Sequence, residues 1–257
     1  RPFLQAYVIL PIETDRLSYW DEINALSKTG KIAPEANICL GDAPHKILNI
    51  QADGSLGTEF TGKISFLPYV HNVDSFGYNT NAIKKGIPYE TESWSWLLDE
   101  QYRGKVGIVN SPTTGIFDLA MAAESKGLIN FNDMSDMTQT EIDGLFSILL
   151  DFKKQHHFAG FWNSVPQSID YMRQGRVHLE SMFSPAVSAL NGDGIPVTYA
   201  APREGYRAWH GVMCLSSECQ GYAKDAADDY MNWWLSGWDG ASGARQGYYI
   251  SKPERET

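Results

Sequence analysis

Histidine and acidic side chains, which could bind a metal or transfer protons, form no recognised catalytic motif in this sequence. His156 and His157 are the only adjacent histidines, and they end a predicted helix. Adjacent helical side chains point about 100° apart, so this pair indicates a solvated helix end rather than a chelate. His178 and Glu180 share one face of a predicted strand, where a metal could meet both, but most such pairs form one side of a sheet. Glycine-rich nucleotide loops, phosphate loops, His-Glu-x-x-His and Gly-x-Ser-x-Gly are absent, so we expect neither catalysis nor a bound metal or cofactor.

Aromatic side chains are the other chemically informative group. The sequence has 8 Trp, 13 Tyr and 11 Phe, which together make up 12% of the chain. Such rings fill hydrophobic cores, and they also line pockets for small organic ligands. Both uses stay open at this point.

Composition and charge narrow the class of protein. The 257 residues allow one large domain or two modest ones, and 43% hydrophobic with 20% charged residues is typical of a globular chain. Lys and Arg total 21 against 31 Asp and Glu, a net charge of −10, which disfavours nucleic acid as a partner. No apolar stretch reaches the ~20 residues that a membrane-spanning helix needs.

Strands alternate with helices along the chain, which predicts an α/β fold with crossover connections. A helix is expected over 14–30, ended by Gly30, and separate strands over 64–70 and 75–79. Thr113 and Thr114 stand at the N-cap position of a helix that follows a strand over 104–109. The other main elements are expected as helices over 140–152, 168–174 and 223–234 and strands over 177–183, 196–200 and 210–215.

The three cysteines, Cys39, Cys214 and Cys219, match neither a zinc site nor a disulfide-rich scaffold. Cys214 and Cys219 are five residues apart, a spacing that a turn could close into a disulfide. The alternative is two small buried thiols, and which one holds depends on the compartment.

Four blocks of sequence carry a more specific signal through their order and spacing. They are LPYVH (67–71) with SFGYN (75–79), SWSWLLDEQYRGKV (93–106), MRQGRV (172–177), and VTYAAPREG (197–205) followed by Trp209. Together, across roughly residues 15–250, they resemble the spermidine/putrescine-type periplasmic solute-binding proteins of ABC transporters.

The resemblance implies the two-lobed type II periplasmic-binding-protein fold, with a ligand cleft between the lobes. The chain would cross between lobes near 76–79 and near 202–209. Lobe 1 is then expected over 1–76 plus 208–257, and lobe 2 over 77–207. Family members open with a strand, a helix and a second strand that are not found before Tyr7, so the N-terminal part of lobe 1 is expected to be missing.

The function implied by the resemblance is solute capture. The protein would be a monomeric periplasmic component, its signal peptide removed, that closes on a small molecule and delivers it to an inner-membrane ABC permease without any cofactor. Two alternatives stay open: the ligand-sensing domain of a receptor, and an enzyme on a related two-lobed scaffold.

Carrying the family's ligand contacts over residue by residue predicts an aromatic site. The family's Pro-Tyr-x-Trp is matched by 68–71, which gives Tyr69 and puts His71 in place of the second aromatic wall. Phe183 matches the aromatic residue at a strand end that stacks on the ligand, and Trp209 matches the Trp that follows the Pro-Lys-Glu-Gly stretch. Aromatic walls of this kind suit a small organic cation or zwitterion.

The acidic residues of the polyamine binders have no counterpart at the matching positions. Gly211 replaces the Asp that holds an ammonium group, and an acidic pair at a helix start falls on Pro112 and Gly115. Asp74 and Glu180 could replace one such contact, so a zwitterion or monoamine is favoured over spermidine. Neutral donors would come from Thr113, Thr114, His71 and His210. The predicted ligand-binding residues are Tyr69, His71, Asp74, Thr113, Thr114, Phe183, Trp209 and His210.

Overall fold

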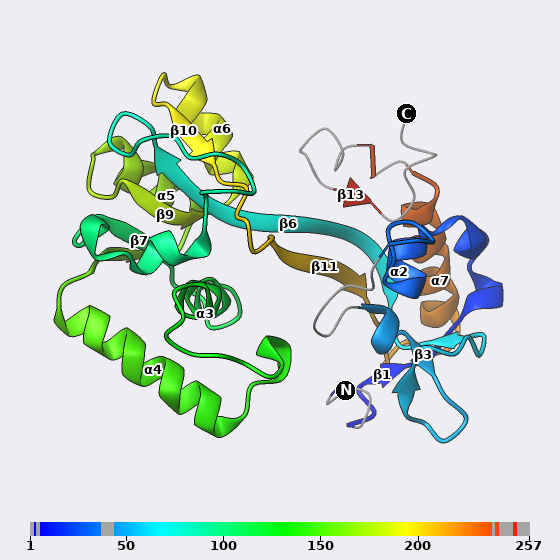
Figure 1. Ribbon diagram of the computed structural model, residues 1–257. Coiled ribbons are helices and arrows are strands. Elements are labelled where there is room, and N and C mark those ends of the chain that lie inside the picture. Colours follow the sequence, from blue (N-terminus) through cyan, green and yellow to red (C-terminus); the bar gives the residue numbers. More distant parts are fainter. Residues whose placement is uncertain (1–2, 4–5, 37–43, 238–239, 242–248, 251–257) are drawn as a thin grey trace. The chain divides into compact units, whose positions relative to one another are not determined.

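The computed structural model describes the chain except residues 1–2, 4–5, 37–43, 238–239, 242–248 and 251–257 (Figure 1). The chain divides into two compact units. Unit 1 comprises Arg1–Asn72 and Trp209–Thr257, and unit 2 comprises Val73–Ala208. The chain passes from one unit to the other inside two strands, β6 (Leu67–Asn79) and β11 (Arg207–Met213). The first boundary follows residue 72, where the sequence predicts residue 76, and the second follows residue 208, where it predicts residue 207.

Unit 2 is built on one sheet covered by helices on both faces (Figure 1). Its strand order is β10-β6-β9-β7-β8, in which β7 runs parallel to β8 and β9, whereas β6 runs antiparallel to β9 and β10. The strands are β7 (Val106–Val109), β8 (Phe158–Trp162), β9 (Leu179–Met182) and β10 (Val197–Tyr199). The helices are α3 (Gly115–Ser125), α4 (Gln139–Lys154), α5 (Val165–Arg173) and α6 (Ser184–Gly192), with short 3-10 turns η4 (Trp94–Leu98), η5 (Glu100–Tyr102) and η6 (Met134–Asp136).

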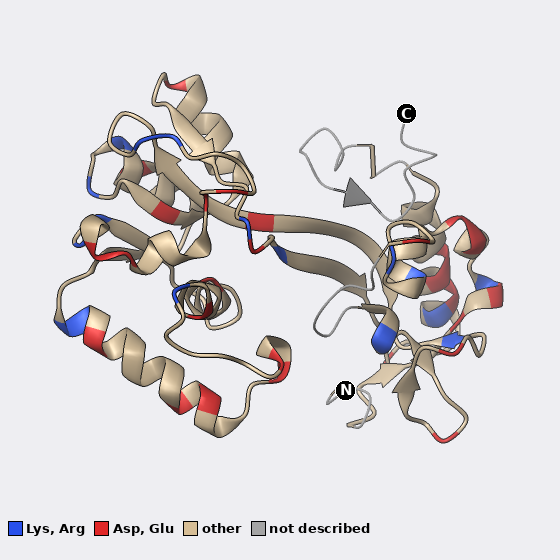
Figure 2. Cartoon of the chain, viewed as in Figure 1, with Lys and Arg blue, Asp and Glu red and all other residues tan. Residues whose placement is uncertain are grey.

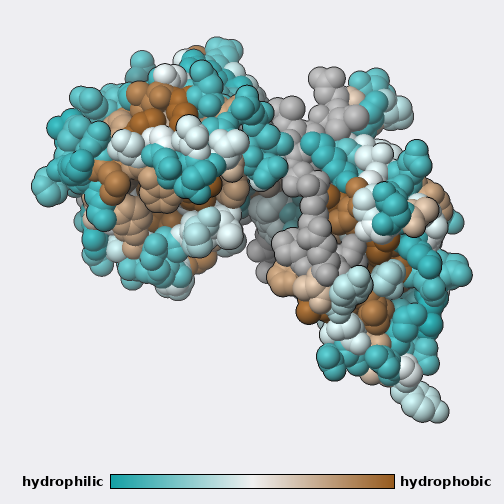
Figure 3. Space-filling model, turned by 90° about the horizontal axis from the view of Figure 1, so that it is seen from below, coloured by the Kyte–Doolittle hydropathy of each residue, from teal (hydrophilic) through white to brown (hydrophobic). Residues whose placement is uncertain are grey.

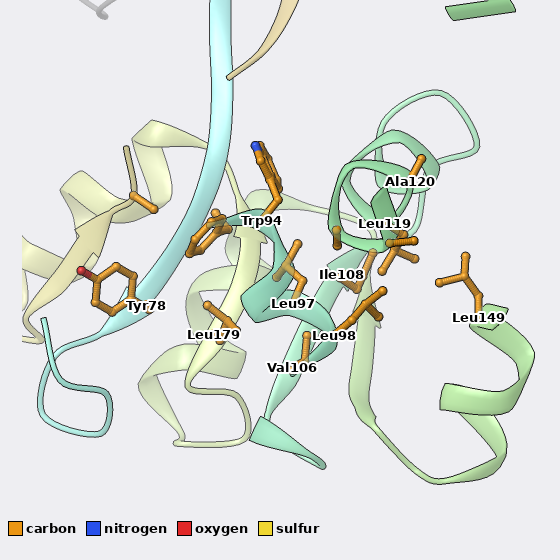
Figure 4. Packing of buried hydrophobic residues seen from close by; sticks show 14 of the residues in the cluster. Tyr78, Trp94, Leu97, Leu98, Val106, Ile108, Leu119, Ala120, Leu149 and Leu179 are labelled. Atoms are coloured by element: carbon orange, nitrogen blue, oxygen red, sulfur yellow. The ribbon is translucent and has the colours of Figure 1, made fainter. Parts of the chain in front are cut away.

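Two hydrophobic clusters fill unit 2, one on each face of the sheet. On one face, α3, α4 and η4 pack side chains such as Trp94, Leu97 and Leu149 against β6 and β7 (Figure 4). On the other, α5 and α6 pack against Trp162 and Met182. Both faces of the sheet are therefore buried, as expected for a mixed sheet whose parallel strands are connected by helices on both sides.

Unit 1 has smaller sheets and a core of its own around Ile12, Trp20, Ile64 and Leu215. One sheet has the order β2-β5-β3-β4, and β1 pairs with β12. The strands are β1 (Ile9–Leu10), β2 (Ile12–Glu13), β3 (Asn49–Ile50), β4 (Leu56–Gly57), β5 (Lys63–Ile64), β12 (Leu215–Ser216) and β13 (Tyr249–Ile250). The helices are α2 (Ala25–Thr29) and α7 (Tyr222–Leu235), with 3-10 turns η1 (Thr14–Arg16), η2 (Trp20–Glu22) and η3 (Pro44–Lys46).

The predicted helix over 14–30 is wrong, because its first half is two separate 3-10 turns and only α2 is helical. The side chain of Asn232 on α7 accepts a hydrogen bond from the Ser18 amide (2.8 Å) and donates one to the Arg16 carbonyl (2.9 Å). These bonds occupy backbone groups that a continuous helix would need. The predicted end at Gly30 is confirmed by its left-handed φ of 73°.

The two strands predicted over 64–70 and 75–79 are largely one strand, β6, while Ile64 belongs to β5. The backbone stays extended between them because other strands pair with it there. β11 pairs with β6, and β13 places Ile250 and Tyr249 opposite Val70 and His71.

The sequence predicts Thr140 as the N-cap of a helix, but α4 already begins at Gln139. Its N-cap is Thr138, whose hydroxyl accepts the Glu141 amide while the Glu141 carboxylate accepts the Thr138 amide, a capping box.

Cys214 and Cys219 are both free thiols in the structure, so neither predicted alternative holds in full: they form no disulfide, and Cys214 is exposed rather than buried. Cys39 lies outside the described residues. No helix in the described ranges is long and apolar enough to cross a membrane. On the face shown in Figure 3, hydrophilic side chains predominate and hydrophobic ones are scattered among them.

Candidate functional site

Four of the predicted ligand-binding residues lie at one edge of the sheet of unit 2. The parallel strands β7, β8 and β9 all end at this edge, which is where open α/β sheets bind ligands. Thr113 and Thr114 follow β7, and Phe183 follows β9. Asp74 precedes Ser75 on β6, and Ser75 is the register partner of Met182 at the end of β9. Asp74, Thr113, Thr114 and Phe183 are therefore brought to the same carboxyl edge.

Asp74 does not stand alone at this edge, because Arg207 bridges it to Asp118 on α3. Arg207 is the basic residue of β11 and Asp74 the acidic residue of β6 (Figure 2). The Nη2 atom of Arg207 lies 3.0 Å from Oδ2 of Asp74, and its Nε atom lies 2.7 Å from Oδ1 of Asp118. The side chains are 12%, 12% and 1% exposed for Arg207, Asp74 and Asp118. Burial lowers the pKa of Arg207, but the two carboxylates outweigh burial and raise its pKa.

The buried hydroxyl of Tyr199 on β10 connects two strands at the same edge through hydrogen bonds. It accepts a hydrogen bond from the Ser75 amide (2.8 Å) and donates one to the Met182 carbonyl (3.1 Å). Burial raises the pKa of Tyr199, so this hydroxyl keeps its proton. Phe183, next in the chain, meets the ring of Trp162 edge to face at 5.2 Å. Phe183 is thus held between the end of β9 and α6, for which it is the N-cap residue.

The segment from β7 to α3 places the two threonines. The Thr113 hydroxyl lies 3.2 Å from the Ser111 hydroxyl, and the Gly115 amide donates to the Ser111 carbonyl (3.0 Å). Thr114 is the N-cap of α3, as predicted, but its hydroxyl makes no capping hydrogen bond within the described chain. The turn is so tight that a Cβ atom on Gly115 would lie 2.0 Å from the Val109 carbonyl oxygen.

The other four predicted residues belong to unit 1, on β6 and β11. The rings of His71 and His210 stack with centroids 5.8 Å apart and 28° between their planes. Burial lowers the pKa of both, and burial together with the neighbouring His71 lowers the pKa of His210 to about 4. Both imidazoles are therefore neutral at neutral pH. Trp209 is half-buried beside His210 in the chain.

Tyr69 packs in unit 1 against Trp234 of α7, edge to face with ring centroids 4.9 Å apart. Its ring also lies across Gly211, where an added Cβ would sit 3.0 Å from the Tyr69 ring and 2.4 Å from Cγ1 of Val70. A side chain at position 211, including the Asp of the polyamine binders, would therefore displace Tyr69 and Val70.

Replacing Gly211 by Ala is expected to cost about 1–3 kcal/mol of unfolding free energy, because the added methyl group overpacks Tyr69 and Val70. Urea denaturation measures this loss. Gly192→Ala at the end of α6, where an added Cβ meets nothing within 4 Å, is the matched control and should change stability by less than about 0.5 kcal/mol. Equal stability of the Gly211 variant and the wild type would contradict the tight packing.

Glu180 and His157 are buried and cannot serve a ligand. Glu180 is 0% exposed, so the prediction that it could replace an ammonium contact is wrong. The Ser168 hydroxyl donates to its Oε1 atom, and its Oε2 atom has no hydrogen-bond partner among the described residues. His157 is also fully buried, with Nε2 2.9 Å from the Leu97 carbonyl oxygen, so it is not a solvated helix end. No group of three or more His, Cys, Asp or Glu in the described parts of the chain could hold a metal ion.

Sequence reasoning did not find Arg207, Asp118 and Tyr199. Asp118 carried a usable signal, because it interrupts the apolar run of α3 and a buried carboxylate requires a partner. No signal in the sequence identified that partner, because Arg207 is 89 residues further along the chain.

Two of the sequence blocks prove to be held together by hydrogen bonds. Glu204 accepts the Ser93 hydroxyl (2.6 Å) and the Trp94 amide (3.2 Å), and the Trp94 indole donates to the Gly205 carbonyl (2.8 Å). Glu204 therefore stabilises the start of η4 and joins the two blocks within unit 2.

Unit 1 also has a pocket of about 400 Å³ that contains none of the predicted residues. Lys63 and Lys224 line it together with Glu13, and the Lys224 Nζ atom lies 3.9 Å from the Glu13 carboxylate. Its charges are thus partly compensated from within the chain.

A family model for bacterial extracellular solute-binding proteins matches residues 7–253. The chain belongs to this family. The predicted resemblance is confirmed, and the matched family is defined by solute binding rather than by catalysis. A search of curated protein sequences finds no match.

Solved structures show the fold of this solute-binding protein. It is similar to the spermidine/putrescine ABC transporter substrate-binding protein PotD of Streptococcus pneumoniae, at 12% identity and a TM-score of 0.64, over 99% of this chain and 65% of PotD. The Tp0655 (TpPotD) lipoprotein of Treponema pallidum matches at 11% identity and a TM-score of 0.63, over 94% of this chain and 63% of that one. The periplasmic binding protein AfuA of Actinobacillus pleuropneumoniae, solved with fructose-6-phosphate, matches at 15% identity and a TM-score of 0.57, over 97% of this chain and 65% of AfuA.

These likenesses confirm the predicted α/β fold of two-lobed periplasmic binding proteins. The solute-binding chain spans about two thirds of the length of the structures it matches. Its ligand does not follow from them, because proteins of this fold bind chemically different solutes.

Proposed function

We propose that this protein is the periplasmic substrate-binding component of an ABC transporter, and that it captures a small amine-containing solute by closure of its two lobes. It would act as a monomer and deliver the solute to an inner-membrane permease. Membership of the extracellular solute-binding family and the fold shared with PotD support this assignment.

The observation that carries the proposal is the grouping of predicted residues at the carboxyl edge of unit 2. Asp74, Thr113, Thr114 and Phe183 come from three separate parts of the sequence and end at one edge. Phe183 also packs on Trp162 and Asp74 also pairs with Arg207, and the same edge gathers an aromatic ring, two hydroxyl groups and a carboxylate. An ammonium group is recognised by an aromatic face and a carboxylate, which this edge supplies.

The charge of this edge favours a small amine over a long polyamine. With both carboxyl groups ionised, Asp74 and Asp118 around the single guanidinium of Arg207 leave one net negative charge. Burial raises the pKa of Asp118, and its contact with Arg207 opposes this and favours the ionised form. Glu180 is too deeply buried to add another charge. One negative charge balances one ammonium group, whereas each further buried ammonium would cost several kcal/mol without a partner. The hydroxyl groups of Thr113 and Thr114, at the start of α3, suit a carboxylate. A zwitterion or monoamine is therefore the favoured solute, and a polyamine the second.

A thermal-shift screen against amino acids, glycine betaine, small monoamines, putrescine, spermidine and fructose-6-phosphate tests the proposal. A solute at 100 times its Kd adds about 2.7 kcal/mol to stability. At roughly 2–4 °C per kcal/mol, Tm should rise by several degrees with a zwitterion or monoamine. A rise with spermidine alone would contradict the preference for one ammonium group, and a rise with fructose-6-phosphate alone would contradict amine binding.

Replacing Phe183 by Ala should abolish the shift given by the active solute, because it removes the aromatic face at the end of β9. The matched control is Phe146→Ala on α4 of the same unit. Phe146 is 48% exposed, and it is far in the sequence from the residues at the carboxyl edge. The control should keep the full shift. An unchanged shift in the Phe183 variant would place the solute elsewhere.

A further inference from the structure

The side chain of Arg207 joins three segments of unit 2 that lie far apart in the sequence. We propose that Arg207 is a positioning residue: it fixes the strands β6 and β11 to α3, and thereby holds the start of α3 at the carboxyl edge. The consequence for solute binding rests on the proposed function, whereas the positioning itself does not.

The location of the three charged residues is the first argument. Asp74 is the second residue of unit 2 after the first boundary, and Arg207 is the second residue before the second boundary. Both are therefore on the strands that connect the two units. Asp118 lies on α3, four residues after its N-cap Thr114. One guanidinium thus ties both connecting strands to the helix whose start carries the two threonines.

The geometry of the guanidinium is the second argument. Its Nε and Nη2 atoms contact different carboxylates, Asp118 and Asp74, at 2.7 and 3.0 Å. Such a forked contact fixes the orientation of the side chain as well as its distance, and an ammonium group cannot reproduce it. Because the three side chains are nearly buried, water competes little for these bonds.

Loss of the guanidinium would remove the cation between Asp74 and Asp118 in a buried place, where burial and Asp74 raise the pKa of Asp118 and, besides Arg207, a hydrogen bond with Ser181 opposes them. Removing one partner of a buried pair is costly because the other charge stays uncompensated. The strain can be relieved by moving α3, since Asp118 is on the helix whereas Asp74 is fixed within the paired strand β6. The start of α3, residues 110–118, is therefore the segment expected to loosen.

Hydrogen–deuterium exchange of the full chain without any solute tests this directly. In Arg207→Met, exchange in peptides covering 110–118 should become at least tenfold faster, while peptides from α5 and α6 keep their wild-type rates. The matched control is Arg203→Met, the same change four residues earlier, where the side chain is 54% exposed and pairs with its neighbour Glu204. It should leave residues 110–118 unchanged.

Arg207→Lys keeps the positive charge but not the forked contact with the two carboxylates. It provides a second variant for the same measurement if Arg207→Met fails to fold. Exchange at 110–118 should then rise to an intermediate rate. Wild-type exchange at 110–118 in both variants would overturn the proposal. Uniformly faster exchange throughout unit 2 would also overturn it, because that result describes a general stabilising role rather than positioning.

The thermal shift given by glycine betaine and by putrescine separates this proposal from the proposed function. If either raises the Tm of the wild type, the rise should shrink in Arg207→Met and remain in Arg203→Met. A full rise in Arg207→Met would count against the effect on solute binding. If neither compound binds, the proposed function loses support, and the exchange rates alone decide the positioning role.

Discussion

Replacing Glu180 by Gln is expected to stabilise the protein at pH 8 and above, and to leave its stability nearly unchanged at pH 4.5. The cause is the buried position of this carboxyl group between β7, β9 and α5. Its side chain is 0% exposed, its one hydrogen bond within the described ranges comes from Ser168, and a Cβ on Gly107 would lie 3.0 Å from its Oε2 atom. Burial raises the pKa of Glu180 to about 8, with the Ser168 hydrogen bond acting in the opposite direction.

The direction of the pH dependence follows from proton binding. Between the ordinary pKa of Glu, 4.5, and about 8, the folded protein keeps the Glu180 proton and the unfolded chain has lost it. The folded state binds more protons, so its stability falls as pH rises through this window and levels off above it. At about 1.4 kcal/mol per pH unit, the loss is about 3–5 kcal/mol across the window. Gln carries no proton to lose and is spared this penalty.

Urea denaturation of the variant and the wild type from pH 4.5 to 9 measures the difference. Glu100→Gln, the same change at an exposed side chain of unit 2, is the control and should follow the wild-type profile. A constant difference between Glu180→Gln and wild type at all pH values would show that folding does not raise the pKa of Glu180.

Among single Gly→Ala changes in unit 2, Gly115→Ala should lower the free energy of unfolding the most. The added Cβ would lie 2.0 Å from the Val109 carbonyl oxygen and 3.2 Å from Cγ2 of Ile108. The first of these is backbone within the sheet, so the start of α3 has to move instead. We expect a loss of about 3 kcal/mol in unfolding free energy, together with loss of the solute-induced thermal shift, because Thr113 and Thr114 move with α3.

The matched control for Gly115 is Gly144 in the middle of α4. There an added Cβ meets only Cδ1 of Ile129 at 3.4 Å, an ordinary contact. Because Ala is a better helix former than Gly, Gly144→Ala should stabilise the protein by about 0.5–1 kcal/mol. If both alanine variants stabilise the protein, the tight turn between β7 and α3 is not present in solution.

The sequence predicted the fold class well because its signals were local or ordered along the chain. The helices α4 and α7 have apolar faces of their own, and the four sequence blocks kept the order of the family. The broken helix over 14–30 was not predictable in the same way. Its backbone groups are bonded by Asn232, a residue more than 200 positions away, and no local pattern announces that contact.

The residues of the candidate site also fall into those that the sequence could predict and those that it could not. Phe183, Thr113 and Thr114 follow strands that the sequence reveals, so their common edge could be predicted. Arg207 could not, because a buried carboxylate such as Asp118 requires a cation without specifying which of the 21 basic residues supplies it.

The way in which the two units divide the chain determines which of them can fold first during synthesis. Unit 2 is one uninterrupted segment, 73–208, whereas unit 1 joins residues before 73 to residues after 208. When Arg207 is added to the growing chain, every residue of both clusters that fill unit 2 has already been made. Leu215, Met231 and Leu235, which complete the core of unit 1, have not. Unit 2 can therefore fold during translation, while the first segment of unit 1 must wait, with part of its apolar surface uncovered, until α7 is made.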